Sequence, residues 1–107
     1  MQSHFEGTVS VAGMEIALSE LADLGAEIWF TEYDTLNPDV NHRADSLEAF
    51  YRYAFSRPET NGIVMWGFWA GAHWRGPDAA LVDLDWSVNA AGQRYFDLMS
   101  ELSLIHI

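Results

Sequence analysis

The sequence contains no cysteine and no lysine, and these two absences exclude several kinds of site. Without cysteine there is no disulfide, no thiolate nucleophile and no cysteine-based zinc site. Without lysine there is no Gly-x-x-x-x-Gly-Lys phosphate loop, and the Gly-x-Gly-x-x-Gly dinucleotide motif is missing too. All 5 basic residues are arginines, and with 16 acidic residues they give a formal net charge of −11. Because nucleic acids and anionic membranes repel such a charge, we expect neither as a partner.

Long apolar runs and a recognisable leader are also missing. No apolar stretch approaches the roughly 20 residues of a membrane span. Residues 1–6 have neither the basic region nor the apolar run of a signal peptide. We expect the chain to begin inside a longer protein, so this says little about where that protein resides. With 107 residues, half of them apolar, the chain forms one domain at most or part of a larger one.

Tryptophan is abundant, with 5 copies, 4 of which lie within one third of the chain at positions 66, 69, 74 and 86. Core packing seldom concentrates indoles in this way, because each buried indole N–H needs a hydrogen-bond partner. Flat, amphipathic indole surfaces suit sugar rings instead. For Trp29 and Trp86 we nevertheless expect core packing.

Apolar periodicity predicts strands that alternate with helices. The predicted elements are a strand at 1–4, a helix at 12–24, a strand at 27–34, a helix at 44–56, a strand at 63–69, a loop at 70–88 and a helix that begins after Asn89. Such alternation implies parallel strands joined by right-handed crossovers. Three strand–helix units cannot close a barrel, so they form part of one or a small open sheet.

The stretch 28–34 reads as a buried strand that ends in two carboxylates. Strict alternation along it places Glu32 and Asp34 on the same face as Phe30, and Tyr33 on the other face. Carboxylates are rarely buried unless they are paired, so Glu32 on an inward face needs a partner or a chemical role. Taken alone, the strand also permits a merely solvated glutamate at its end.

Polar and aromatic residues follow the C-terminal ends of all three predicted strands, namely His4, Glu32, Asp34, Trp66 and Trp74. Parallel α/β folds place their active sites at this end of the sheet. The coincidence across three strands favours catalysis. A zinc site is disfavoured, because the histidines at 42 and 73 lie in predicted loops without the i, i+4 spacing of ligands.

Three short motifs occur in order, at 2–4 (Gln-Ser-His), 29–34 (Trp-Phe-Thr-Glu-Tyr-Asp) and 65–69 (Met-Trp-Gly-Phe-Trp), and Trp74 follows eight residues after Trp66. Together they resemble the C-terminal part of a family-10 glycoside hydrolase, from residue 1 to about residue 100. The Trp-Gly-Phe-Trp motif is similar to the plant-like branch of that family. These enzymes are endo-β-1,4-xylanases on a (β/α)8 barrel. The resemblance therefore implies a partial TIM (β/α)8 barrel of α/β class, about strands six to eight with their helices.

The resemblance also implies catalytic roles. Glu32 would be the nucleophile of a retaining mechanism, which passes through a glycosyl-enzyme intermediate. His4 would hydrogen-bond this nucleophile, and Asp34 would hold the other side of the imidazole ring. The family's acid/base is a glutamate at the end of strand four, which we expect to precede this chain. No glutamate of the present sequence matches its motif.

Further residues match the family's sugar site beside the cleaved bond. Trp66 and Trp74 match its wall and lid, and Gln2 matches a glutamine near the same sugar. Arg75 is either a substrate contact or a surface-loop arginine. The implied partner is a β-1,4-linked polysaccharide, xylan or a xylo-oligosaccharide, and secretion of the full-length protein is implied as well. No metal or cofactor is implied.

Two departures from common xylanases, Tyr33 for leucine and Phe68-Trp69 for Thr-Asp, leave the preferred polysaccharide open. Two other interpretations also remain open. The protein is a non-catalytic carbohydrate-binding relative, or the isolated chain is inert because its strand edges are unpaired. Residues 102–107 resemble the translation of a sequencing adapter. We therefore expect the domain to span 1–101, treat 102–107 as a non-native tail and give His106 no role.

Overall fold

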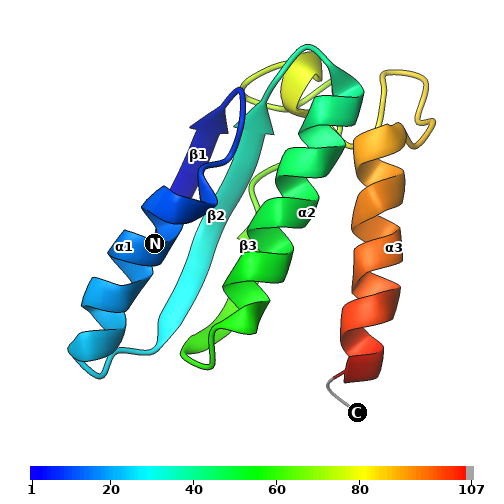
Figure 1. The fold of residues 1–107 in the computed structure, drawn as a ribbon. Coiled ribbons are helices and arrows are strands. Elements are labelled where there is room, and N and C mark those ends of the chain that lie inside the picture. The colour runs from blue at the N-terminus through cyan, green and yellow to red at the C-terminus, as the bar shows by residue number, and fades with distance from the viewer. Residues whose placement is uncertain (106–107) are drawn as a thin grey trace.

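The computed structural model describes residues 1–105, and 106–107, including His106, lie outside the described residues. The elements are β1 (Gln2–Glu6), α1 (Val11–Asp23), β2 (Ile28–Leu36), α2 (Val40–Ser56), β3 (Thr60–Met65), the short 3₁₀ helix η1 (Pro77–Ala79) and α3 (Ala90–Ile105). The predicted alternation of strands and helices is confirmed (Figure 1). None of the helices within 1–105 combines the length and apolar character needed to span a bilayer.

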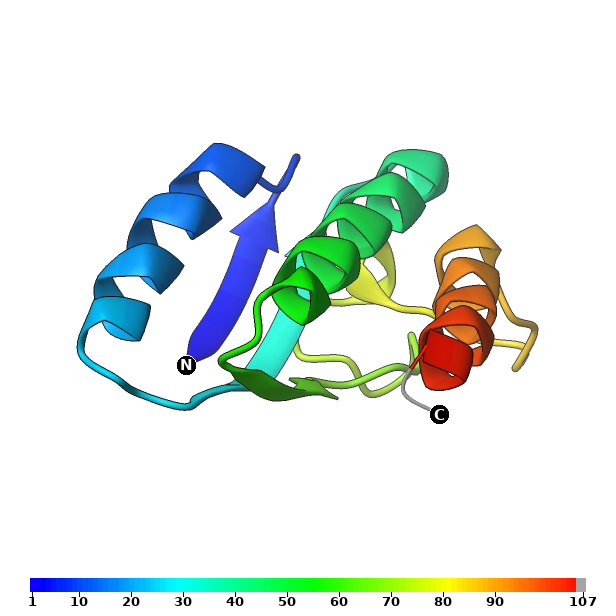
Figure 2. The same cartoon turned by 60° about the horizontal axis from the view of Figure 1, so that its bottom comes forward.

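The three strands form one parallel sheet in the order β1-β2-β3. Helices α1 and α2 lie over the same face of the sheet, and α3 packs along α2 (Figures 1 and 2). No helix of the described residues covers the opposite face (Figure 2), which carries the side chains of His4, Glu32 and Asp34. Because the strands are parallel, their C-terminal ends meet at one edge. The strands β1 and β2 each continue two residues beyond their predicted ends at 4 and 34, so His4, Glu32 and Asp34 lie within the strands, just before this edge.

The core forms where α2 packs on the helix-covered face of β2. Phe50 of α2 has no exposed surface, and its ring contacts Phe5, Phe30, Tyr33 and Tyr51 at centroid distances of 5.6, 5.0, 4.2 and 5.9 Å. Most of these ring pairs meet edge to face, which their quadrupoles favour. Phe50 therefore joins β1, β2 and α2 in one aromatic cluster.

Capping side chains fix where the helices begin. Asp39 accepts hydrogen bonds from the backbone N–H groups of Asn41 and His42, so α2 begins four residues before its predicted start at 44. The predicted cap at Asn89 is confirmed, because its side chain accepts from the N–H of Gly92 at 3.0 Å. Helix α3 continues through Ile105. That 102–107 is a non-native tail stays a prediction.

The last strand is shorter than predicted. It ends at Met65 rather than at residue 69, because the chain turns at Gly67, whose φ of +92° is accessible mainly to glycine. Two further expectations are wrong. Trp29 and Trp86, assigned to the core, are 51% and 61% exposed.

A β-bulge in β2 changes which side chains share a face. Phe30 pairs with Ile63 of β3, whereas Tyr33 pairs with Met65, so three steps along β2 match two along β3. Tyr33 consequently lies with Phe30 on the helix-covered face, where both contact α2. Glu32, the neighbour of Tyr33, points to the open face. Strict alternation predicted that Phe30 and Glu32 share a face, and this prediction is wrong.

Replacement of Phe50 tests the aromatic cluster. We expect Phe50→Ala to lower the free energy of unfolding by about 3–5 kcal/mol, because the cavity cannot collapse among rings held by three elements. Ile16→Ala on the exposed side of α1 is the control and should cost less than about 0.5 kcal/mol. Urea unfolding of the full-length protein measures both. Equal losses would show that the core is not centred on Phe50.

Candidate active site

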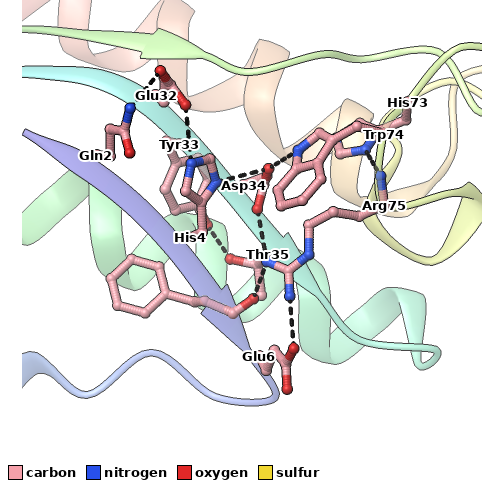
Figure 3. A network of polar contacts seen from close by, with 11 residues as sticks. Gln2, His4, Glu6, Glu32, Tyr33, Asp34, Thr35, His73, Trp74 and Arg75 are labelled. Carbon is pink, nitrogen blue, oxygen red and sulfur yellow. Dashed lines mark hydrogen bonds and ion pairs between the residues drawn. The ribbon is translucent and has the colours of Figure 1, made fainter.

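Strands β1 and β2 bring the first group of predicted residues together. Their parallel register pairs Gln2 with Glu32 and His4 with Asp34. Paired residues of neighbouring strands project to the same side of a sheet, here the open face. Figure 3 shows Gln2 and His4 beside the two carboxylates. The backbone pairing alone therefore places these four side chains next to one another.

His4 bridges the two carboxylates, as expected from the sequence. Its Nδ1 lies 3.0 Å from Oδ2 of Asp34, and its Nε2 lies 3.0 Å from Oε2 of Glu32. Gln2 donates from Nε2 to the other Glu32 oxygen, Oε1, at 2.8 Å. Each oxygen of Glu32 is therefore held by one side chain of β1. The carboxylate remains partly exposed to solvent, with 19% of its side chain accessible.

Asp34 is the buried member of the pair, with a side chain that has no exposed surface. Besides His4, it accepts from Trp74 Nε1 at 2.7 Å and from Arg75 Nη1 at 2.8 Å. The three partners, which include the Arg75 guanidinium, satisfy this buried carboxyl group without water. We infer that Nδ1 of His4 carries a proton directed at Asp34.

Arg75 is not a surface-loop arginine. Its side chain is only 9% exposed, and it also donates to the Phe5 carbonyl at 2.9 Å and pairs with Glu6 at 3.0 Å. The guanidinium lies 5.4 Å from the Trp74 ring centroid, within cation–π range. Arg75 therefore ties the loop after β3 to β1 and β2. A direct contact between Arg75 and substrate stays a prediction.

Trp66 directly follows β3, and Trp74 lies eight residues later in the loop that follows this strand. Both are exposed, and they line an open hollow of about 410 Å³ together with Val64, Met65, Gly67 and Ala72. The Trp74 ring also contacts the His4 imidazole edge to face at 5.3 Å. The hollow therefore adjoins the carboxylate network and offers two indoles to a ligand.

His73 is a member of this region whose position the sequence did not reveal. It is buried, its Nδ1 accepts from the Arg75 N–H at 3.1 Å, and its buried Nε2 has no hydrogen-bond partner among the described residues. Burial lowers the pKa of His73, Asp34 opposes this shift, and the guanidinium groups of Arg75 and Arg43 add to it. The accepting Nδ1 requires the neutral ring. Its position beside Trp74 in the sequence was the available signal.

The described residues contain no group of three or more histidine, cysteine or acidic side chains placed to hold a metal ion. The arrangement instead offers a solvent-accessible carboxylate fixed on both oxygens, beside an aromatic hollow. Such a carboxylate can act as a nucleophile, a base or a sugar-hydroxyl acceptor.

Comparison with known proteins identifies the family. The sequence model of Glycosyl hydrolase family 10 matches residues 1–96. The chain belongs to glycosyl hydrolase family 10. The family-10 chain is 39% identical over 85 residues to Endo-1,4-beta-xylanase 2 of Arabidopsis thaliana. This alignment covers 79% of the present chain and 8% of the Arabidopsis protein. It is also 48% identical over 101 residues to Anti-sigma-I factor RsgI6 of Acetivibrio thermocellus. That alignment covers 94% of the present chain and 13% of the relative.

Solved structures of family-10 enzymes have the same fold. Xylanase 10B of Thermotoga petrophila RKU-1, solved in complex with xylobiose, superposes with a TM-score of 0.78 at 18% sequence identity. The superposition covers 94% of this chain and 35% of that one. The family-10 chain is therefore part of a TIM barrel. It spans only 13% and 8% of the lengths of the two curated relatives.

The Asp34–Arg75 pair predicts a stability difference. Arg75→Met keeps the aliphatic stem but leaves a buried carboxylate without its cation, so we expect a loss of about 3–5 kcal/mol in unfolding free energy. The control is Arg94→Met, whose guanidinium pairs with Asp45 and Glu48 near the surface and should cost about 0–1 kcal/mol. Chemical denaturation measures both. Similar losses would contradict a special role for the buried pair.

His73 predicts a pH dependence. Because its folded-state pKa lies below the ordinary value of 6.5, the unfolded chain binds the proton more readily, and stability falls as pH drops below about 6.5. The loss ends once pH passes below the folded-state pKa. We expect His73→Gln to reduce this fall, measured as the thermal midpoint between pH 7.5 and pH 5. A variant as pH-sensitive as the unsubstituted protein would refute the assignment.

Proposed function

We propose that the chain is the C-terminal part of the catalytic barrel of a retaining endo-β-1,4-xylanase, with Glu32 as the nucleophile. The observation that carries this proposal is the placement of Glu32. It stands on the open face of β2, two residues before Asp34, fixed through both oxygens and still accessible. The family membership supports the same chemistry, and the aromatic hollow beside Glu32 suits a pyranose ring.

In the first proposed step, a Glu32 oxygen attacks the anomeric carbon of a xylosyl unit. The bond to the leaving oxygen breaks, and that oxygen takes a proton from the acid/base glutamate. This glutamate lies outside the 107 residues, at about 5–5.5 Å from Glu32 in a retaining enzyme. In the second step, the same residue removes a proton from water, which attacks the ester and releases Glu32. The net anomeric configuration is retained.

His4 and Asp34 act in this proposal as positioning residues. Asp34 is itself fixed by Trp74 and Arg75, so the imidazole between the carboxylates has little freedom. The Nε2 atom of His4 lies 3.0 Å from Oε2 of Glu32 and so helps to hold this carboxyl group in one orientation. When Glu32 becomes an ester, it loses its charge, and the same contact weakens. The interaction between His4 and Glu32 is thus strongest in the free enzyme and when hydrolysis of the glycosyl ester regenerates the carboxylate.

The proposed substrate is a β-1,4-linked polysaccharide, either xylan or a xylo-oligosaccharide. Trp66 and Trp74 would bind the sugar beside the cleaved bond, and Gln2 would contact it from β1. The departure at Tyr33 lies on the helix-covered face and does not touch this hollow. Phe68 is exposed and remains the departure that can affect substrate choice. Secretion of the full-length protein belongs to the same proposal.

A second candidate function is carbohydrate binding without cleavage. One relative, 48% identical, is named as an anti-sigma factor rather than as an enzyme. The binding alternative keeps the roles of the two indoles but requires no nucleophile. The residue at the acid/base position before this chain distinguishes the two, because a binding protein does not need a glutamate there.

Azide rescue of Glu32→Ala in the full-length protein tests the proposal. We expect hydrolysis of an activated aryl β-xylobioside to fall by several orders of magnitude, because the covalent intermediate cannot form. Added azide should restore turnover and give a glycosyl azide of inverted configuration. Glu15→Ala on the exposed side of α1 is the control and should act like the unsubstituted protein.

Two outcomes would contradict this assignment. Full activity of Glu32→Ala would remove Glu32 from the chemistry. An unsubstituted protein that binds xylan and cleaves neither substrate would favour the binding function instead.

A further inference from the structure

Trp86 lies outside the site around Glu32, and nothing in the proposed mechanism uses it. We propose that its indole is a second sugar-stacking surface, which binds a xylosyl unit of a polysaccharide whose other part lies in the active site. This inference rests on the proposed function for the identity of the sugar. It concerns a separate residue on a separate turn, between η1 and α3.

The Trp86 ring is exposed but held in place. It is 61% exposed, and it stacks on the Trp69 ring with a centroid distance of 4.4 Å and an interplanar angle of 12°. Trp69 in turn lies so close to Gly71 that a Cβ there would overlap its ring. An indole fixed on one side by a second indole needs little ordering when a ligand arrives. This is the geometry of a rigid, flat binding surface.

The backbone at Trp86 supports a role for its side chain. Its φ is +68°, and it is the one non-glycine residue with a positive φ among residues 1–105. For a bulky aromatic residue this conformation is strained, whereas glycine or asparagine adopts it readily. The turn is closed by hydrogen bonds from Asp83 N–H to the Ser87 carbonyl and from Trp86 N–H to the Asp83 carbonyl, both 2.9 Å. These bonds use only backbone atoms, so the turn does not require tryptophan.

The surroundings select a neutral, hydroxyl-rich ligand. Asp83 and Asp85 belong to the same turn as Trp86, in a chain of net charge −11, which disfavours anions. Each uses its Oδ1 within the turn region, to accept from Asn89 and from Ser87 respectively. Carboxylates accept hydrogen bonds from hydroxyl groups, while the indole packs on the apolar face of a sugar ring. The turn also lies at the end of the molecule where the strands end (Figure 1), so a long polysaccharide can reach both places. A short substrate that fills only the active site does not.

Trp86→Gly in the full-length protein tests this inference, because it removes the ring and relieves the strained φ. In a Glu32→Ala background, we expect affinity for soluble xylan to fall about tenfold by calorimetry. In the otherwise unsubstituted enzyme, the rate on an aryl β-xylobioside should change less than twofold. The thermal midpoint should stay constant or rise. Leu84→Ala, an exposed apolar residue of the same turn, is the control and should bind like the parent.

Unchanged xylan affinity in Trp86→Gly, or an equal loss in Leu84→Ala, would overturn the inference. Loss of self-association without loss of xylan affinity would overturn it in favour of contact with a second copy. If Trp86→Gly destabilises the fold, N-bromosuccinimide oxidation of Glu32→Ala protein decides, with Trp86 mapped by mass spectrometry. Protection of Trp86 by xylohexaose supports the inference, and oxidation at the same rate overturns it. The proposed hydrolase function fails separately, if the unsubstituted protein does not cleave the aryl β-xylobioside.

Discussion

The buried carboxylate of Asp34 is the interaction on which the site depends. Removing a charge from water is costly unless donors replace the lost hydration. Here the donors come from two other segments, His4 on β1 and Trp74 with Arg75 in the loop after β3. Satisfying one carboxylate therefore holds three parts of the chain together. Glu32, two residues earlier, makes fewer contacts and keeps the accessibility that a reacting group needs.

The same contacts balance charge locally in a strongly acidic protein. Arg75, Asp34, His4 and Glu32 follow one another as cationic, anionic, proton-sharing and anionic groups. Each carboxylate meets a donor rather than a like charge, although the chain carries −11 overall. Interactions across 3 Å in a partly buried site outweigh distant charges, which salt screens. The acidic surface and the ionised site are thus largely independent.

The sequence was sufficient where local rules decide the structure. Periodicity predicted the order of strands and helices, and Asn89 was identified as a cap because its side chain acts on its own neighbours. Asp39 caps α2 in the same way, so the start of α2 at Val40 could also have been predicted from the sequence. The faces of β2 could not, because the bulge at Phe30–Tyr33 depends on pairing with a distant strand. The position of Trp86 likewise depends on a distant residue, its stacking partner Trp69 in the loop after β3.

Because of the bulge in β2, neighbouring residues of this strand have different structural roles. Tyr33 packs against α2, whereas Glu32 and Asp34 contact His4 on the open face. The loop after β3 is tied to the sheet by the Arg75 side chain and by a backbone hydrogen bond from the Trp66 N–H to the Tyr33 carbonyl. The bulge therefore lets neighbouring residues of one strand serve two faces, with packing on one side and the polar network around Asp34 on the other.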